Sequence, residues 1–297
     1  MVKQFKLSAL YFTALLSVFS LPAYCSSQTD GTAQIYPSLW TAEDPLLQKQ
    51  LEAVIKQLGL WRPVKQKHLS VVLVDISNPL KPRLAHVNGN KMFYAASLPK
   101  IAILLAAFVE IQNGNLQETD ELMDHLVKMI RFSNNKSATH VLNLIGGERV
   151  LEILQLPQYS LYSPENNGGI WVGKAYAKGS AFHRDPLHHL SHGATGIQAA
   201  RFYYLLETRQ LLTPEYSKKM KAVLGNPGIK HKLVKGLADI NGIKFYRKSG
   251  SWKNFHADSA IIEQGDKKYI VVILSDSAKG GQWITRLAKP LHKLIIQ

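Results

Sequence analysis

The chain has 297 residues, of which 46% are hydrophobic and 19% are charged. This composition is typical of a packed globular protein and excludes a disordered, collagenous or coiled-coil chain. Lys and Arg number 36 against 21 Asp and Glu, and the net charge of +15 favours anionic partners such as nucleic acid, anionic lipid or a cell-wall polymer. The length fits two domains or one large α/β unit.

The N-terminus has the pattern of a secretory signal peptide. Two lysines precede an apolar run over residues 7–21, and small residues leading to Cys25 follow it. We therefore expect a signal peptide over residues 1–25, a secreted or periplasmic protein, no nucleic-acid partner and no stable membrane anchor. Cleavage after Cys25, the only cysteine, excludes a disulfide; lipidation of Cys25 is the weaker alternative, because Tyr24 is bulky for such a site.

The first third of the chain is expected to hold a tether, a helix and a hairpin. Residues 26–39, read as the tether, begin with a small polar stretch that lacks periodicity. Apolar residues spaced at three and four predict an amphipathic helix over residues 45–60. β-branched runs between turn signals predict strands over residues 69–76 and 83–87.

The rest of the chain is predicted to be helical first and then rich in strands. Helices are expected over residues 101–111, 119–132, 138–144, 195–207 and 213–224, and a last one over 281–296. Strands are expected over residues 243–251, 257–263 and 269–275. Residues 155–193 lose periodicity, and a loop of that length is often functional. Strands at both ends predict one shared sheet, with the helical block packed against it.

A serine and a lysine stand at the start of the apolar helix, in Ser97-Leu98-Pro99-Lys100. Three residues apart on a helix, the two side chains face the same side. Serine needs a base to become a nucleophile, and a lysine desolvated against an apolar helix has its pKa lowered toward that role. A serine and a lysine at this spacing are common by chance. Taken alone, the pair also fits a serine that caps the helix and a lysine on the protein surface.

Two further motifs follow in order, Ser133-Asn134-Asn135 and Lys248-Ser249-Gly250-Ser251. Together the three resemble the signatures of class A β-lactamases and penicillin-binding D,D-peptidases. The order of predicted elements is similar to that superfamily over about residues 40–296. The resemblance implies an α+β fold, with an antiparallel sheet flanked by N- and C-terminal helices and an inserted all-helical subdomain. A single catalytic domain would span residues 40–297, with 40–96 and 225–297 as its α/β part and 97–224 mainly helical.

The resemblance also implies catalytic roles. Ser97 would be the acylated nucleophile and Lys100 its proton acceptor. Ser133 would pass a proton to the leaving nitrogen, since amide cleavage needs a neutral amine. The backbone N–H groups of Ser97 and Ser251 would form the oxyanion hole.

Substrate binding would fall to the other motif residues. Asn135 would bond to the substrate's side-chain amide, while Lys248 and Ser249 of the motif that ends at Gly250 would hold its carboxylate. Lys174, after the ordered turn that starts at Gly168, is a further candidate for substrate contact, or an ordinary solvated lysine.

Several positions depart from the class A pattern. Asn134 replaces the usual acidic residue, and the spacing from Ser97 to Ser133 is short, so the helical part is trimmed. The loop glutamate that activates the deacylating water in typical class A enzymes has no counterpart where counting places it. Glu165 and Asp185 are the available substitutes, each otherwise an exposed loop acid.

The loop also gathers histidines, at positions 183, 188, 189 and 192. Their spacing is usable for zinc, but they are read as polar loop residues, and neither a metal nor a cofactor is expected. Lys230, His231, Lys232 and Lys235 are read as a solvated basic patch, with anionic wall material as the alternative partner.

The sequence thus predicts an exported active-site-serine amide hydrolase that opens β-lactam rings through an acyl-enzyme and deacylates slowly. The alternatives are a D,D-carboxypeptidase or endopeptidase acting on peptidoglycan stem peptides, and a non-catalytic relative that binds the cell wall. A monomer is expected.

Overall fold

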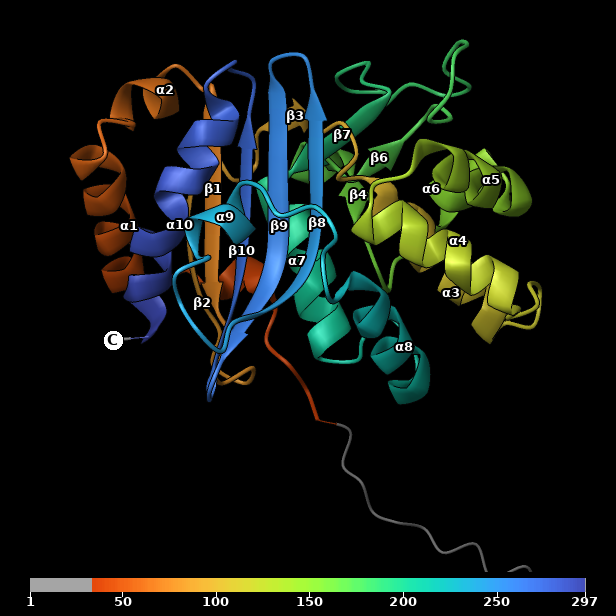
Figure 1. Cartoon of the computed structure of the whole chain (residues 1–297), viewed down its shortest axis with the longest axis horizontal. Coiled ribbons are helices and arrows are strands. Elements are labelled where there is room, and N and C mark those ends of the chain that lie inside the picture. Colours follow the sequence, from red (N-terminus) through yellow and green to blue (C-terminus); the bar gives the residue numbers. More distant parts are fainter. Residues whose placement is uncertain (1–33, 297) are drawn as a thin grey trace, which may run out of the picture. The chain divides into compact units, whose positions relative to one another are not determined.

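A five-stranded antiparallel sheet forms the centre of the structure, a computed structural model that describes residues 34–296 (Figure 1). The strand order is β2-β1-β10-β9-β8, so the strands from the two ends of the chain meet where β1 pairs with β10. The strands are β1 (Leu69–Asp75), β2 (Arg83–Val87), β8 (Lys244–Trp252), β9 (Phe255–Gln264) and β10 (Lys267–Ser275). This confirms the predicted antiparallel sheet shared by the two ends of the sequence.

Helices cover both faces of this sheet because the strands alternate their side chains between two cores. Val71 and Leu73 of β1 face one core, while Val72 and Val74 face the other. Against the first core pack α1 (Pro45–Gln57) and α10 (Gly280–Ile296), which lie side by side in Figure 1. Against the second packs α7 (Gly196–Glu207), which begins at the side-chain cap Thr195. The short helices α2 (Trp61–Lys65) and α9 (Leu233–Gly236) and the 3-10 turn η1 (Leu39–Thr41) complete this part.

The helical part is built around α3 (Lys100–Gln112), which is buried along almost its whole length. Around it stand α4 (Asp120–Arg131), α5 (Asn135–Ile145), α6 (Gly147–Gln155) and α8 (Pro214–Leu224). These amphipathic helices turn their apolar faces to α3, which explains why its sequence is apolar all round.

Short strands order the segment that the sequence left without periodicity. A three-stranded sheet joins β3 (Met92–Tyr94), β7 (His192–Thr195) and β6 (Trp171–Val172) in the order β3-β7-β6. A two-stranded ladder joins β4 (Tyr162–Ser163) and β5 (Gly168–Gly169), and the 3-10 turn η2 (Pro164–Asn166) connects them. The expectation of a loop without periodicity over residues 155–193 was therefore too simple, because strands of two to four residues leave no period to detect.

Other boundaries shifted for local reasons. The first helix ends at Gln57 instead of residue 60, because Gly59 adopts a left-handed φ of 70° and reverses the chain. The helices α2 and α6 and the strand β3 were not expected from the sequence.

The expected signal peptide and most of the expected tether lie outside the described residues, and the compact unit begins at Tyr36. Among residues 34–296, no helix is long and apolar enough to cross a membrane.

Candidate active site

Ser97 lies in a turn between β3 and α3. The helix itself starts at Lys100, so Ser97 precedes its first turn, and the Lys100 N–H bonds to the Ser97 carbonyl at 3.3 Å. Ala96, directly before Ser97, has a left-handed φ of 51°. Such a conformation costs on the order of 1–3 kcal/mol for a residue with a side chain and is concentrated at functional sites.

Strand β8 passes directly against this turn, and Gly250 makes the approach possible. A Cβ added to Gly250 would lie 2.3 Å from the Ala95 oxygen and 2.7 Å from the Ser97 nitrogen. Only glycine fits at that distance from backbone atoms. Gly250, which directly precedes Ser251 in β8, therefore lies against the backbone N–H of Ser97.

The Lys100 side chain is fully buried at the base of the site. Its Nζ donates to the Ser133 carbonyl and to Asn135 Oδ1, both at 2.7 Å, and lies 3.5 Å from Ser133 Oγ. Within residues 34–296 it forms no ion pair with a carboxylate. Burial lowers the pKa of Lys100 to about 7, so a large fraction of this amine is neutral at neutral pH.

Ser133 stands between two lysines. It occupies the turn from α4 to α5 with a left-handed φ of 57°, and Asn134 caps α5 through the Ser137 N–H. Lys248 Nζ donates to Ser133 Oγ at 2.9 Å, a shorter contact than the one from Lys100. This hydroxyl can therefore exchange protons with either amine.

Lys248 projects from β8, and its charge is poorly compensated. It is buried, donates to the Ser249 carbonyl at 2.7 Å, and has its pKa lowered well below the ordinary value by burial and by the charges of Lys100 and Arg247. Asp258, whose charge acts in the opposite direction on this pKa, is fully buried and held by both Nε and a terminal nitrogen of Arg247 at 2.7 Å. Ser249 itself is also buried. The site thus holds more basic than acidic side chains.

Lys232 adds to that charge, although the sequence placed it in a solvated patch. It is only 5% exposed, and its Nζ donates to the Gly250 carbonyl at 2.6 Å and to Ser251 Oγ at 2.8 Å. Its backbone is strained, with φ 56° and ψ −116°, and burial lowers its pKa to about 8. The solvated reading is wrong for this residue, since a lysine gives no sequence signal of burial.

Tyr176 is a second site residue that the sequence analysis missed. Its ring lies over Lys100, with Nζ 4.4 Å from the ring centroid, and its hydroxyl donates to the Ala96 carbonyl at 3.3 Å. His192 fixes this part of the loop through a 3.0 Å bond between Nε2 and the Lys174 carbonyl. Burial lowers the pKa of His192 to about 4, so the ring is neutral and donates from Nε2. Lys174, the candidate for substrate contact or an ordinary solvated lysine, is half-buried and contributes this carbonyl.

Neither candidate loop acid lies beside Lys100. Glu165 is exposed in η2, where the neighbouring Asn167 bonds to the Asn90 carbonyl, near the start of β3 and not at its Ser97 end. Asp185 is fully buried and accepts from the Tyr162 hydroxyl at 2.5 Å. It also accepts backbone N–H bonds from three residues of its own loop, Leu187, His188 and Leu190. The expectation of an exposed acid at position 185 is wrong, because the chain folds around this carboxylate.

The loop histidines do not converge on one point. His183 contacts Glu148, His188 contacts Asn167, and His192 contacts Lys174. Trp171 anchors the loop: it is buried, packs on Tyr162 with ring centroids 4.5 Å apart, and donates to the His183 carbonyl.

Comparisons with known proteins agree with this fold. The structure of PBP-A superposes with a TM-score of 0.63 at 15% identity, covering 87% of this chain and 98% of that one. A PBP-A mutant in an acyl-enzyme complex with penicillin G gives 0.62 at 14% identity, covering 84% and 96%. A class A β-lactamase representative from Bacteroides cellulosilyticus gives 0.65 at 15% identity, covering 84% and 98%.

The sequence has no significant match among curated proteins. It does match the family described as "Beta-lactamase enzyme family" over residues 46–124 and 121–295, almost the whole compact unit. This match confirms the resemblance carried by the three motifs. The chain belongs to the beta-lactamase enzyme family.

Proposed function

We propose that this protein is an exported serine amide hydrolase in which Ser97 is acylated by a substrate that carries a carboxylate. The observation that carries the proposal is the buried Lys100, whose pKa of about 7 supplies a neutral amine three residues after Ser97 in the chain. In the first step Lys100 takes the Ser97 proton, Oγ bonds to the amide carbon, and the backbone N–H groups of Ser97 and Ser251 hold the oxyanion.

The second step breaks the C–N bond and returns the proton. Ser133 Oγ gives its proton to the leaving nitrogen and recovers one from Lys100 or Lys248, which both lie within 3.5 Å of it. The products are the acyl-Ser97 ester and a neutral amine. In a β-lactam the amine stays attached through the opened ring.

The charge of the site supports an anionic substrate. Lys100, Lys232 and Lys248 are buried around it, whereas the one buried carboxylate there, Asp258, is bound to Arg247. A substrate carboxylate near Ser249 compensates this charge. β-Lactams and peptidoglycan stem peptides both present one, and a PBP-A mutant of this fold forms an acyl-enzyme with penicillin G.

Slow deacylation is part of the proposal. Hydrolysis of the ester needs a base that activates a water molecule, and no carboxylate of residues 34–296 contacts Lys100, which Tyr176 covers instead. Such a base contributes roughly 10²–10⁴ in rate. We therefore expect fast acylation of Ser97, which opens the β-lactam ring, and slow hydrolysis of the resulting ester. Glu165 is the remaining candidate for a weak base in that hydrolysis.

The test combines labelling and turnover. Incubation with a fluorescent penicillin, followed by intact-protein mass spectrometry, should give one adduct that Ser97→Ala lacks. Nitrocefin should give a burst of about one equivalent and then a slow steady rate. Absence of an adduct at any penicillin concentration refutes the enzyme proposal, and fast hydrolysis without a burst in Glu165→Gln refutes slow deacylation.

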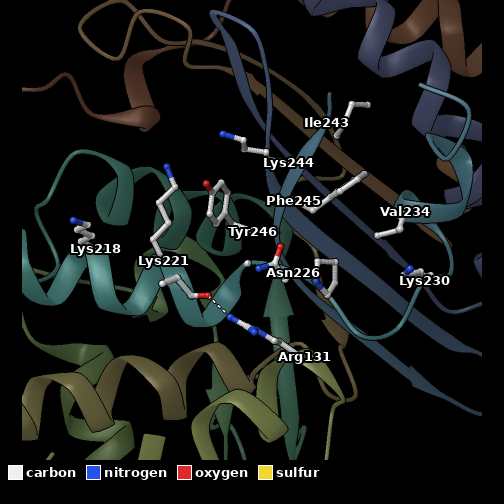
Figure 2. A pocket seen from close by; sticks show the side chains of 13 residues that line it. Arg131, Lys218, Lys221, Asn226, Lys230, Val234, Ile243, Lys244, Phe245 and Tyr246 are labelled. Carbon is white, nitrogen blue, oxygen red and sulfur yellow. Dashed lines mark hydrogen bonds between the residues drawn. The ribbon is translucent and has the colours of Figure 1, made fainter. Parts of the chain in front are cut away.

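A groove beside β8 favours the non-catalytic wall-binding alternative. Figure 2 shows Lys221 of α8 beside Tyr246 of β8, with Lys218 farther away on α8, and Lys230 lies on the connection toward α9. The groove measures about 770 Å³, and its described lining includes five cations and no carboxylate. Lys221 is paired with Glu207 and Glu263, whereas the other three lysines form no ion pair within residues 34–296.

Sedimentation with purified peptidoglycan separates the two functions. The binding function is supported if Ser97→Ala still binds the wall and still restores the wild-type phenotype to cells that lack the protein. The triple variant Lys218→Gln, Lys230→Gln, Lys244→Gln should then lose both properties. If Ser97→Ala abolishes the phenotype, the hydrolase is supported.

A further inference from the structure

Three potential metal ligands meet on the outer side of the α4–α5 pair, away from the loop histidines. Glu121 and His125 lie one turn apart on α4, and His140 lies on α5. A spacing of four residues puts the first two on one helical face, and the packing of α4 on α5 brings the third to them. Their ligand atoms all lie within 4.8 Å of one another.

The histidine rings are positioned for ligation. Buried Ser137 places its Oγ 3.1 Å from His125 Nδ1, which leaves Nε2 of that ring for a metal. The His125 and His140 rings stack with centroids 4.3 Å apart and an interplanar angle of 31°. Within residues 34–296 neither ring forms an ion pair with a carboxylate at 4.0 Å or less, and the Glu121 carboxylate lies within 4.8 Å of both.

We propose that Glu121, His125 and His140 form a binding site for a divalent transition metal such as Zn²⁺. Two imidazoles and one carboxylate are a known zinc donor set, and they disfavour the harder Mg²⁺ and Ca²⁺. Metal–ligand distances of about 2.0–2.1 Å place tetrahedral ligand atoms about 3.4 Å apart, which requires the ligand atoms to close by up to about 1.4 Å. Glu121 and His140 are exposed and can rotate inward, and a water molecule completes the coordination.

The metal would brace the two helices that carry the catalytic turn. Ser137 contacts His125 through its hydroxyl and donates its backbone N–H to Asn134 Oδ1, the cap of α5. Asn134 lies between Ser133 and Asn135 in that turn. A metal that links α4 to α5 would therefore stabilise the turn that carries Ser133 without contacting Ser133 itself.

The purified chain, without a polyhistidine tag and stripped with EDTA, tests the site directly. Equilibrium dialysis against Zn²⁺ with metal analysis should give one ion per chain. At a hundredfold excess of Zn²⁺ over the dissociation constant, the melting temperature should rise by about 5–10 °C. Glu121→Gln and His140→Gln, both at exposed positions, should weaken binding at least tenfold and remove most of this rise.

Two variants separate this site from other zinc binding. His68→Gln removes a half-exposed histidine that pairs with Asp276 elsewhere, and it should change neither the stoichiometry nor the melting shift. Ser137→Ala keeps every ligand and should weaken binding about tenfold or more, because it frees the His125 ring. Equal affinity in wild type and His140→Gln, or no ion bound at 100 μM Zn²⁺, overturns the site. Stoichiometric binding with no melting shift overturns the bracing. Ser97→Ala should bind Zn²⁺ like wild type, so this result is independent of the proposed hydrolase.

Discussion

The rate of acylation should depend on pH through Lys100. The amine is fully buried, and its pKa is lowered to about 7, so the neutral form that accepts the Ser97 proton is populated as the pH rises. The neutral fraction rises from about one tenth at pH 6 to about nine tenths at pH 8. The limiting rate constant for acylation at saturating penicillin should therefore rise about tenfold over this interval.

Binding of the substrate carboxylate should change in the opposite direction. Lys232 has a pKa of about 8, and the pKa of Lys248 is also lowered, so both lose positive charge as the pH rises. Affinity for the anionic substrate should fall above pH 8. The ratio of the acylation rate constant to the apparent dissociation constant of the penicillin should then have a bell-shaped dependence on pH. The limiting rate constant for acylation should only rise with pH and level off.

Stopped-flow mixing with a fluorescent penicillin at a series of concentrations separates the two quantities. Lys100→Met fills similar space and cannot accept a proton, so its residual rate should be roughly 10²–10⁴-fold lower and should not rise through pH 7. A wild-type rate constant that is flat between pH 6 and 8, without a rise at higher pH, would show that Lys100 is not the base. A midpoint near 10 would show instead that burial does not lower the pKa of Lys100.

Three further outcomes follow from packing. Gly250→Ala places a Cβ 2.3 Å from the Ala95 carbonyl oxygen, so penicillin labelling should fall at least about 10²-fold and the melting temperature should drop. Asp258→Leu leaves buried Arg247 unpaired and should cost about 3–5 kcal/mol in urea unfolding, less if Arg247→Met is added. Asp185→Asn weakens the contacts that organise its loop and should cost about 1–3 kcal/mol, while the deacylation rate per folded molecule stays unchanged; a selective loss of deacylation would contradict its structural role.

The sequence predicted the main sheet and most helices because these elements are long enough to show a period. The strands expected over residues 243–251, 257–263 and 269–275 are β8, β9 and β10 within a few residues. Short strands carry no such period. Residues 92–94 form a strand only because residues 192–195 pair with them, and that partner lies far along the chain.

Some residues of the candidate site could be predicted from the sequence and others could not. The three motifs could be found from the sequence because the chemistry requires specific residue types at fixed spacings, and the structure brings Lys100, Ser133 and Lys248 together. The burial of Lys232 under β8 and the position of Tyr176 over Lys100 have no local signature.

What the sequence determined by itself is therefore the family, the nucleophile candidate and the sign of the charge, all of which follow from residue identity. Only the tertiary structure decided which polar side chains are buried. Burial depends on segments that are separated in the sequence. Asp185, for example, accepts a hydrogen bond from the Tyr162 hydroxyl, and Asp258 accepts one from the Arg247 guanidinium. Since burial lowers the pKa of Lys100 and of Lys232, the reactivity and charge of the site are properties of the folded chain.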